Sequence, residues 1–398
     1  MTGNLDDNQP MKKICFLIDS IFSYGGVQRV TAVIAKELSQ EYDVTIVTFD
    51  NSETKDTSLY GLREAPITYR FVSYPPVGWL HKKLCRAFSG FYKKVQPQSE
   101  WMSNLYARSS FSAPRRKMLV SVLSKGQYDT IVGVHAPLAA RLATMRPWLK
   151  GVRCVGWIHN SFGALFSSSS RYIGPELKRH YVYQLRKLDE TVVLCQYDAK
   201  KYKEYDVRFE PTVIYNPLTL VPGKPSDGTS KRFLAVGRFS RLHKGFDLLI
   251  DAFHIFAETN KDWVLDIVGE GTEEQLYREK IASYRLDRRI FLHPFTNCIQ
   301  EYYSNAQVYV LSSRWEGFGL VLVEAMAHGL PVVSSDLPTS LEIMGTFGLY
   351  FQNGNIEDLA EKLHDATMID WKMKSEEALI IAHRFDVKEI MNQWREII

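Results

Sequence analysis

The hydrophobic and polar positions of this chain follow two different periods. Short apolar runs bounded by turn residues predict buried strands, and longer segments with apolar residues at helical spacing predict helices. In the first half, strands are predicted at 13–19, 44–49, 128–134, 152–158, 190–194 and 213–215. Helices are predicted at 27–38, 137–146 and 172–188. Strands that alternate with helices in this way predict a parallel, doubly wound sheet.

The second half repeats the arrangement after a break. Residues 217–230 (PLTLVPGKPSDGTS) have the composition of a linker. Strands are then predicted at 232–236, 264–268, 290–292, 308–311 and 331–334. Helices are predicted at 245–258, 273–284, 299–305, 320–328, 356–368, 371–384 and 387–397. The pattern predicts an α/β protein with two Rossmann-like, doubly wound domains, 11–216 and 231–386, which face an interdomain cleft.

Length and composition fit this picture. The chain has 398 residues, of which 45% are hydrophobic and 24% charged, as in globular proteins. It has no apolar run of 18 residues, so no transmembrane helix is predicted. Residues 1–10 are polar and acidic, so we expect a disordered extension and not a signal peptide.

The five cysteines are scattered singly along the chain. This spacing argues against a disulfide framework or a zinc site and favours a reducing, cytoplasmic location. Cys15, Cys154 and Cys195 lie in apolar runs and are expected in the core.

Charge is distributed unevenly. Residues 1–200 contain 27 Lys and Arg against 16 Asp and Glu, a balance of +11, whereas residues 201–398 contain 22 against 29, a balance of −7. The excess is concentrated in an insertion at 79–125, where basic residues alternate with aromatic ones. This mixture favours a peripheral helix or hairpin on an anionic membrane surface, at the inner face of the cell membrane. A solvated insertion is the alternative; nucleic acid is a third, which no binding motif supports.

The stretch RWEGFGLVLVE (314–324) carries the strongest chemical signal. Glu316 lies in a glycine-containing loop after a predicted strand, and Glu324 lies about two turns along the following helix. A loop of this kind before a helix N-terminus can hold a phosphate, because the first N–H groups and the helix dipole favour negative charge. The alternative is an ordinary strand–helix unit with two surface acids.

Three other predicted strand ends carry unusual residues. Arg238 and Lys244 lie in the loop 237–245, where they could stabilise a departing diphosphate without a metal, or simply form a solvated basic loop. His159 follows an apolar strand and is either catalytic or structural. Gly25 and Gly26 permit a close backbone approach to a ligand, although a plain turn explains them equally well.

These segments together resemble the glycosyltransferase-B fold, and within it family 4 of the retaining glycosyltransferases. The resemblance spans nearly the whole chain from Met11 and includes the family's Glu-x7-Glu motif, Glu316 to Glu324. The segments that carry it are 23–30 (SYGGVQRV), 214–217 (IYNP), 236–253 (VGRFSRLHKGFDLLIDAF), 267–271 (IVGEG) and 312–336 (SSRWEGFGLVLVEAMAHGLPVVSSD). Gln28 departs from the pattern, since an acid is commoner there.

The resemblance implies a role for each candidate residue. Arg238 and Lys244 would bind the donor diphosphate, Glu316 would bind the hydroxyls of the transferred sugar, and Glu324 would bind the ribose. His159 would contact the donor sugar near the reacting carbon. The remaining donor-binding positions implied are Gly25, Gly26, Gly237, Pro294, Phe295, Thr296, Gly317, Phe318, Gly319 and Leu320. No metal or other cofactor is implied, and the helix at 387–398 would cross back to the first domain.

The expected activity is therefore transfer of a hexose or N-acetylhexosamine from a nucleotide sugar, with UDP as the expected nucleotide. The first domain would hold a glycan or lipid-linked acceptor, as in bacterial surface polysaccharide synthesis. The alternatives are a nucleotide-sugar epimerase or a phosphorylase on the same fold, and a non-catalytic adaptor. A phosphorylase would need a cofactor lysine motif that is not found, and an adaptor would be expected to have lost Arg238, Lys244 or Glu316.

Overall fold

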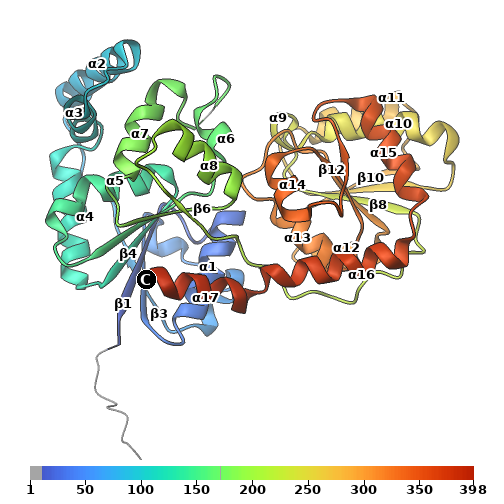
Figure 1. Cartoon of the computed structure of the whole chain (residues 1–398), viewed down its shortest axis with the longest axis horizontal. Helices are drawn as coiled ribbons and strands as arrows, with labels where there is room; N and C mark the ends of the chain where they lie inside the picture. The colour runs from blue at the N-terminus through green and yellow to red at the C-terminus, as the bar shows by residue number, and fades with distance from the viewer. Residues whose placement is uncertain (1–10, 171) are drawn as a thin grey trace, which may run out of the picture. The chain divides into compact units, whose positions relative to one another are not determined.

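The computed structural model describes residues 11–170 and 172–398. The extension predicted at 1–10 lies outside the described residues. The chain divides into two compact units (Figure 1): the first runs to Ile214 and includes Met391–Ile398, and the second covers Tyr215–Ile390. Each unit is an α/β domain built on a parallel sheet.

The sheet of the first unit has seven strands in its described part, in the order β3-β2-β1-β4-β5-β6-β7. The strands are β1 (Lys13–Ile18), β2 (Asp43–Thr48), β3 (Ile67–Phe71), β4 (Thr130–Val134), β5 (Arg153–Trp157), β6 (Glu190–Val193) and β7 (Thr212–Val213). Neighbours pair in parallel, and the order reverses between β1 and β4. In such sheets ligands bind beyond the carboxyl ends of the strands at this reversal.

The helices of the first unit differ from the prediction at 172–188 and in the insertion at 79–125, and two further helices, Phe162–Phe166 and Gln196–Tyr205, were not predicted. They are α1 (Gly26–Leu38), α2 (Trp79–Val95), α3 (Glu100–Ser110), α4 (Ala113–Gly126), α5 (Ala136–Met145), α6 (Phe162–Phe166), α7 (Lys178–Leu185) and α8 (Gln196–Tyr205). The helix predicted at 172–188 begins only at Lys178, because Gly174 has a left-handed φ of 92° and Pro175 opens a short 3-10 turn. The basic and aromatic insertion forms three helices, α2 to α4, instead of one helix or hairpin.

The second unit has a six-stranded sheet with the order β10-β9-β8-β11-β12-β13, which reverses between β8 and β11. Its strands are β8 (Arg232–Val236), β9 (Val264–Val268), β10 (Ile290–His293), β11 (Val308–Leu311), β12 (Val332–Ser335) and β13 (Leu349–Phe351). Its helices are α9 (Arg241–Lys244), α10 (Phe246–Thr259), α11 (Glu274–Ser283), α12 (Ile299–Asn305), α13 (Leu320–Ala327), α14 (Pro338–Met344), α15 (Ile356–Thr367) and α16 (Trp371–Ala382). The fold class predicted from the sequence is confirmed.

The last helix, α17 (Val387–Ile397), ends in the first unit. Trp394 is fully buried there and its ring meets that of Trp157 edge-on, with centroids 4.7 Å apart. Arg395 forms an ion pair of 2.7 Å with Glu41, and Nε of Arg153 donates to the Ile397 carbonyl at 2.7 Å. The carboxyl end of the chain is thus part of the first unit's core.

The cysteines and the hydropathy of the helices also bear on the interpretation of the sequence. Cys15, Cys154 and Cys195 are buried free thiols, which confirms their predicted place in the core. Within the described residues, none of the helices is long and apolar enough to cross a bilayer.

Candidate functional site

The strongest candidate site lies in the second unit, where two loops leave the sheet at the reversal of strand order. One loop follows β8 and the other follows β11, and these strands are neighbours. Oγ of Ser312 donates to the Lys244 carbonyl at 2.9 Å, and the backbone N–H of Arg314 donates to the His243 carbonyl at 2.7 Å. The two loops are therefore joined by one backbone–backbone hydrogen bond and by one from a serine side chain to the backbone.

Gly245 allows this close approach. The residues before it, which were predicted to form a loop throughout, make the single helical turn α9, and Gly245 then adopts a left-handed φ of 65°. A Cβ added at this position would lie 2.1 Å from the carbonyl oxygen of Ser312. Only glycine satisfies both requirements without strain, so this position fixes where α9 presents Lys244.

Lys244 and Glu316 form the centre of the site. Nζ of Lys244 lies 2.6 Å from Oε1 of Glu316, and Oγ of Ser313 donates to the same oxygen at 2.6 Å. Glu316 is only 9% exposed. Burial raises the pKa of Glu316, but Lys244 and His243 lower it by more, so the net pKa lies well below its usual value. The carboxylate is therefore ionised and can only accept hydrogen bonds.

An aromatic pair borders this carboxylate. The rings of His243 and Trp315 are stacked, with centroids 3.8 Å apart and planes 7° from parallel. Nε2 of His243 lies 3.8 Å from Oε2 of Glu316, which is beyond hydrogen-bond distance. Sequence analysis gave no role to Ser313, His243 or Trp315, although all three stand within segments that carry the resemblance.

Arg238 adds a second cation on the same side of the sheet. It is exposed, and in the described part of the chain no ion pair or hydrogen bond engages its guanidinium. Its backbone neighbours are fixed: the N–H of Gly237 donates to the Val268 carbonyl at 3.0 Å, and the N–H of Phe239 donates to the Glu270 carbonyl at 2.7 Å. The guanidinium thus projects from a well-supported loop and remains available to an anion.

The loop after Glu316 leads into α13. Phe318 is buried, whereas Gly319 has a left-handed φ of 90° and caps the helix that begins at Leu320. Gly317 lies between Glu316 and Phe318. The helix therefore begins four residues after Glu316, close to the predicted place, and the positive end of its dipole lies at the end of the Glu316 loop.

Glu324 is a buried acid and not a surface one. It is 2% exposed, and its Oε2 accepts a hydrogen bond of 2.9 Å from the hydroxyl of Tyr303 on α12. Both Glu324 and Glu316 act electrostatically on Tyr309, a buried residue of β11 whose pKa is raised mainly by burial. The two acids of the motif therefore border one buried phenol, and neither is simply solvated.

The segment Pro294, Phe295 and Thr296 follows β10, at the edge of the same sheet. Phe295 is 43% exposed, and Oγ1 of Thr296 accepts a hydrogen bond of 3.0 Å from the N–H of Cys298. The segment is therefore an ordered turn with one exposed aromatic ring.

In the first unit, His159 follows β5 and is 7% exposed. Its ring lies 4.2 Å from that of Trp157 and 5.4 Å from that of His135. Burial, and then the charge of His135, hold the pKa of His159 well below its usual value, so the imidazole is neutral at pH 7. No described residue hydrogen-bonds its Nε2.

His135 is the partner that sequence analysis missed. It directly follows β4 and starts α5 with a left-handed φ of 73°, which is unusual for a residue other than glycine. Its N–H donates to the Trp157 carbonyl at 2.8 Å. The carboxyl ends of β4 and β5 therefore present two adjacent histidines.

Gly25 and Gly26 open α1 after β1. The backbone at Gly25 is extended, so no left-handed conformation requires a glycine there. The N–H of Gly25 donates to the hydroxyl of Tyr60 at 2.9 Å, and that hydroxyl donates to the Ser23 carbonyl at 2.9 Å. The turn is thus fixed by Tyr60. Among the described residues, no group of three or more His, Cys, Asp or Glu side chains is placed to hold a metal ion.

Two family models match the chain in succession. The model described as "Glycosyltransferase Family 4" matches residues 24–220, and the model described as "Glycosyl transferases group 1" matches residues 220–380. The chain belongs to the glycosyltransferases with the GT-B fold.

Relatives and solved structures agree with this assignment. An uncharacterized glycosyltransferase of Haemophilus influenzae is 24% identical, covering 98% of this chain and 100% of its own. The amylovoran biosynthesis glycosyltransferase AmsD of Erwinia amylovora is 27% identical, with coverages of 83% and 82%. The crystal structure of Anabaena HepE in complex with UDP and glucose matches with a TM-score of 0.72 at 21% identity, over 97% of this chain and 98% of that one.

Proposed function

We propose that this glycosyltransferase moves a hexose or N-acetylhexosamine from a UDP-sugar to a glycan or lipid-linked acceptor in bacterial surface polysaccharide synthesis. The observation that carries the proposal is the ion pair between Lys244 and the buried Glu316, in the loop that precedes the N-terminus of α13. The name of the Erwinia relative, an amylovoran biosynthesis enzyme, supports the surface glycan, and the UDP and glucose bound by HepE support the donor.

The leaving group sets the first chemical requirement. Cleavage of the bond between the sugar and the diphosphate places negative charge on the departing phosphate oxygen. Cations and N–H dipoles that are already in place lower the barrier, because they need no reorganisation as the charge develops. Arg238 and Lys244 are the cations proposed for this role, and the first turn of α13 supplies the dipole.

Glu316 is proposed to hold the sugar that is transferred. An ionised carboxylate accepts hydrogen bonds from sugar hydroxyls, and the low pKa of Glu316 keeps it ionised when those hydroxyls arrive. A lysine ammonium has three N–H donors, so Lys244 can keep one on Glu316 and direct the others at a phosphate. The reaction is proposed to retain the anomeric configuration and to need no metal, with Glu324 binding the ribose and 294–296 facing the base.

The alternatives make different demands on these residues. A nucleotide-sugar epimerase would need the donor alone and no acceptor. A non-catalytic adaptor would have no reason to keep Lys244 ionically paired with Glu316 beside an unpaired Arg238, so the transferase is favoured. The roles of Gly25, Gly26 and His159 stay predictions, as does a cytoplasmic site of action at the inner face of the membrane.

Transfer itself is the test of this proposal. Radiolabelled UDP-sugars would be incubated with the protein and with lipid-linked glycans extracted from bacterial membranes, and label in the lipid phase would be counted. We expect one donor to label the lipid phase, and we expect this label to be lost in Glu316→Ala. If that donor is an α-sugar, the anomeric proton coupling constant should show that the product is α-linked as well. Epimerised nucleotide sugar without lipid label would support the epimerase instead.

A further inference from the structure

The α2 helix carries a stripe of apolar side chains that remains largely uncovered. Leu80, Leu84, Phe91 and Val95 are 57%, 63%, 52% and 53% exposed. At 3.6 residues per turn, these four positions fall within about 60° of one another around the helix axis. Contiguous exposed apolar surface of this kind is unusual on a soluble domain and marks an interaction surface.

The stripe is not the side of α2 that packs on the neighbouring helix. Tyr92 is 2% exposed and stacks on Tyr106 of α3 with ring centroids 4.4 Å apart. Phe88 lies 6.5 Å from the same ring, and Oγ of Ser89 lies 3.3 Å from the Tyr106 hydroxyl. Other residues of α2 therefore form the contact with α3, and the apolar stripe remains free to bind a partner.

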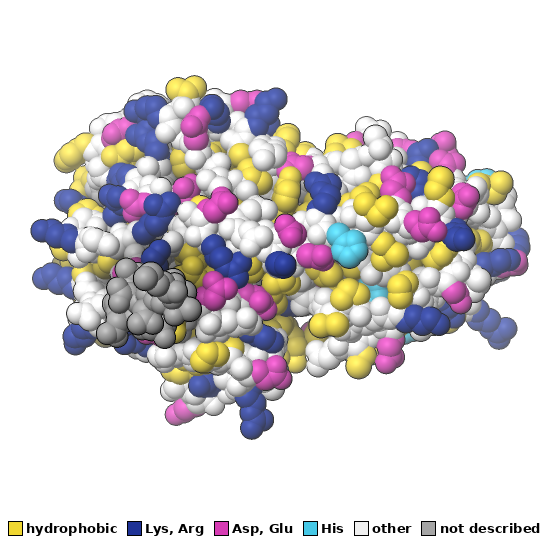
Figure 2. All heavy atoms as spheres, turned by 60° about the horizontal axis from the view of Figure 1, so that its bottom comes forward, with side chains coloured by type: hydrophobic (Ala, Val, Ile, Leu, Met, Phe, Trp, Pro, Cys, Tyr) yellow, Lys and Arg dark blue, Asp and Glu magenta, His cyan; other side chains and the backbone are white. Residues whose placement is uncertain are grey.

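Basic residues flank the stripe. Lys83 and Lys94 lie on the neighbouring face of α2, and Lys82 and Arg86 follow around the helix. Within the described residues, none of these four side chains has an ion-pair partner. Figure 2, in which the bottom of Figure 1 is turned forward, shows that Lys and Arg side chains are also spread over other parts of the first unit, at the left. The four basic residues of α2 themselves make the surface beside the stripe positive.

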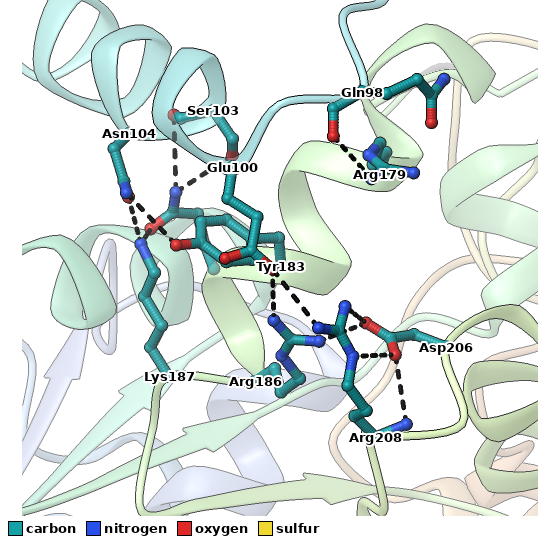
Figure 3. A network of polar contacts seen from close by, with 11 residues as sticks. Gln98, Glu100, Ser103, Asn104, Arg179, Tyr183, Arg186, Lys187, Asp206 and Arg208 are labelled. Atoms are coloured by element: carbon teal, nitrogen blue, oxygen red, sulfur yellow. Dashed lines mark hydrogen bonds and ion pairs between the residues drawn. The ribbon is translucent and has the colours of Figure 1, made fainter.

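The one acid of the two helices does not offset this charge, because it faces the body of the unit. Glu100 at the start of α3 pairs with Arg186 at 2.8 Å and with Arg208 at 3.6 Å. Figure 3 shows this network, in which residues of α3 meet residues of α7 and the segment after α8. Nδ2 of Asn104 also donates to the Tyr183 hydroxyl at 3.2 Å.

A buried contact completes this attachment. Oγ of Ser103 lies 2.8 Å from Nδ1 of His180, and both residues are less than 5% exposed. The helix pair is thus fixed to the unit by several contacts of α3 and by the ion pair of 3.5 Å between Lys93 of α2 and Glu176, while α2 lies at the periphery of the unit (Figure 1). A surface that binds α2 would therefore also hold the first unit in place.

We propose that α2 docks on an anionic lipid bilayer. The four apolar side chains would enter the boundary between headgroups and acyl chains, and the flanking lysines would contact lipid phosphates. An apolar stripe beside lysines is the pattern that binds such an interface, whereas a nucleic acid would leave the stripe exposed to water. The helix has 17 residues, about 25 Å, so several headgroups lie along it.

Vesicle flotation tests the proposal without donor or acceptor, so the result is independent of the transferase activity. The full-length protein would be mixed with neutral vesicles of phosphatidylcholine or with anionic vesicles that also contain about 30 mol% phosphatidylglycerol, which gives them a negative surface potential. One variant combines Leu84→Gln with Phe91→Gln, and another combines Lys83→Glu with Lys94→Glu. The matched controls are Met368→Gln with Ile380→Gln, at exposed apolar positions of the second unit, and Lys150→Glu with Lys261→Glu, at exposed lysines outside the insertion 79–125.

We expect the protein to float with anionic vesicles and not with neutral ones. Each α2 variant should lower the partition coefficient at least about tenfold, since each charge or buried apolar group contributes on the order of one kcal/mol. The controls should bind like the wild type, and all variants should melt at the wild-type temperature because the changed positions are exposed. Equal binding to both vesicle types, unchanged binding in either α2 variant, or equal loss in the controls would overturn the proposal.

Discussion

Nζ of Lys244 lies 2.6 Å from Oε1 of Glu316, although the two residues are 72 positions apart. They meet because β8 and β11 are parallel neighbours, so the loops at their carboxyl ends share one edge of the sheet. The contact joins the cation proposed for the diphosphate to the carboxylate proposed for the sugar. Binding of the donor and positioning of its sugar are therefore expected to depend on each other.

This relationship predicts a pH effect. The pKa of Glu316 is lowered because Lys244 and His243 outweigh the effect of burial. In Lys244→Met the main opposing charge is removed, so the pKa of Glu316 should rise and the carboxylate should take up a proton at mildly acidic pH. As the pH is lowered, the residual rate of UDP release in Lys244→Met should therefore begin to decline at a higher pH than the rate of the wild type does. The exposed Lys261→Met is the control and should leave the acid limb of the pH profile unchanged.

Gly245 makes a prediction about stability. Gly245→Ala should lower the free energy of unfolding of the second unit by about 2 kcal/mol or more, because the methyl group would meet the Ser312 carbonyl at a left-handed φ. Gly354 has a φ of 88° but open space around its Cα, so Gly354→Ala should show the smaller cost of backbone strain alone, about 1 kcal/mol. Equal urea denaturation midpoints for the two variants would contradict this account of the loop.

His180 should contribute to acid sensitivity. Burial lowers the pKa of His180 to about 3, whereas an unfolded histidine has a pKa near 6.5. Between these values the unfolded chain binds the extra proton, so the stability that neutral His180 provides is present above pH 6.5 and is lost as the pH falls towards 3.

The corresponding measurement is the free energy of unfolding at several pH values from 7 to 4. His180→Gln should reduce its slope by up to about 1.4 kcal/mol per pH unit relative to the wild type. The exposed His364→Gln should keep the wild-type slope. An unchanged slope in His180→Gln would mean that the Ser103–His180 contact tolerates protonation.

Trp394 is expected to be important for the stability of the first unit. Trp394→Ala removes a fully buried side chain that packs edge-on against Trp157, and should cost about 3–5 kcal/mol. Trp148 is 49% exposed, so Trp148→Ala should cost far less. Thermal melts compare the two variants, and similar melting temperatures would show that the chain end does not support the first unit.

The sequence predicted the second unit well for a physical reason. Strands 232–236, 264–268 and 308–311 are central in the sheet, and apart from Arg232 and Asp266 their residues form apolar runs that coincide with the strands. The strands that were missed, β3 and β13, lie at sheet edges. In β3 buried and exposed residues alternate, so its apolar signal is weak.

The candidate site was predicted only in part. Glu316, Lys244 and Arg238 could be named because cations and acids at strand ends have a chemical interpretation. Ser313 and His135 could not, because a serine gains its role from the direction of one hydrogen bond, and the left-handed backbone of His135 has no sequence signature. Contacts of this kind depend on loops that are distant in sequence and adjacent in the sheet.

Release of nucleoside diphosphate tests the central claim most directly. The purified protein would be incubated in EDTA with each UDP-, GDP- and ADP-sugar in turn, alongside Lys244→Ala, Glu316→Ala and the control Lys261→Ala. We predict slow release of UDP from one UDP-sugar, unchanged in the control and reduced at least about 100-fold in the two site variants. Release that is equal in the wild type and both site variants, or no release and no thermal shift with any nucleotide, would contradict the account.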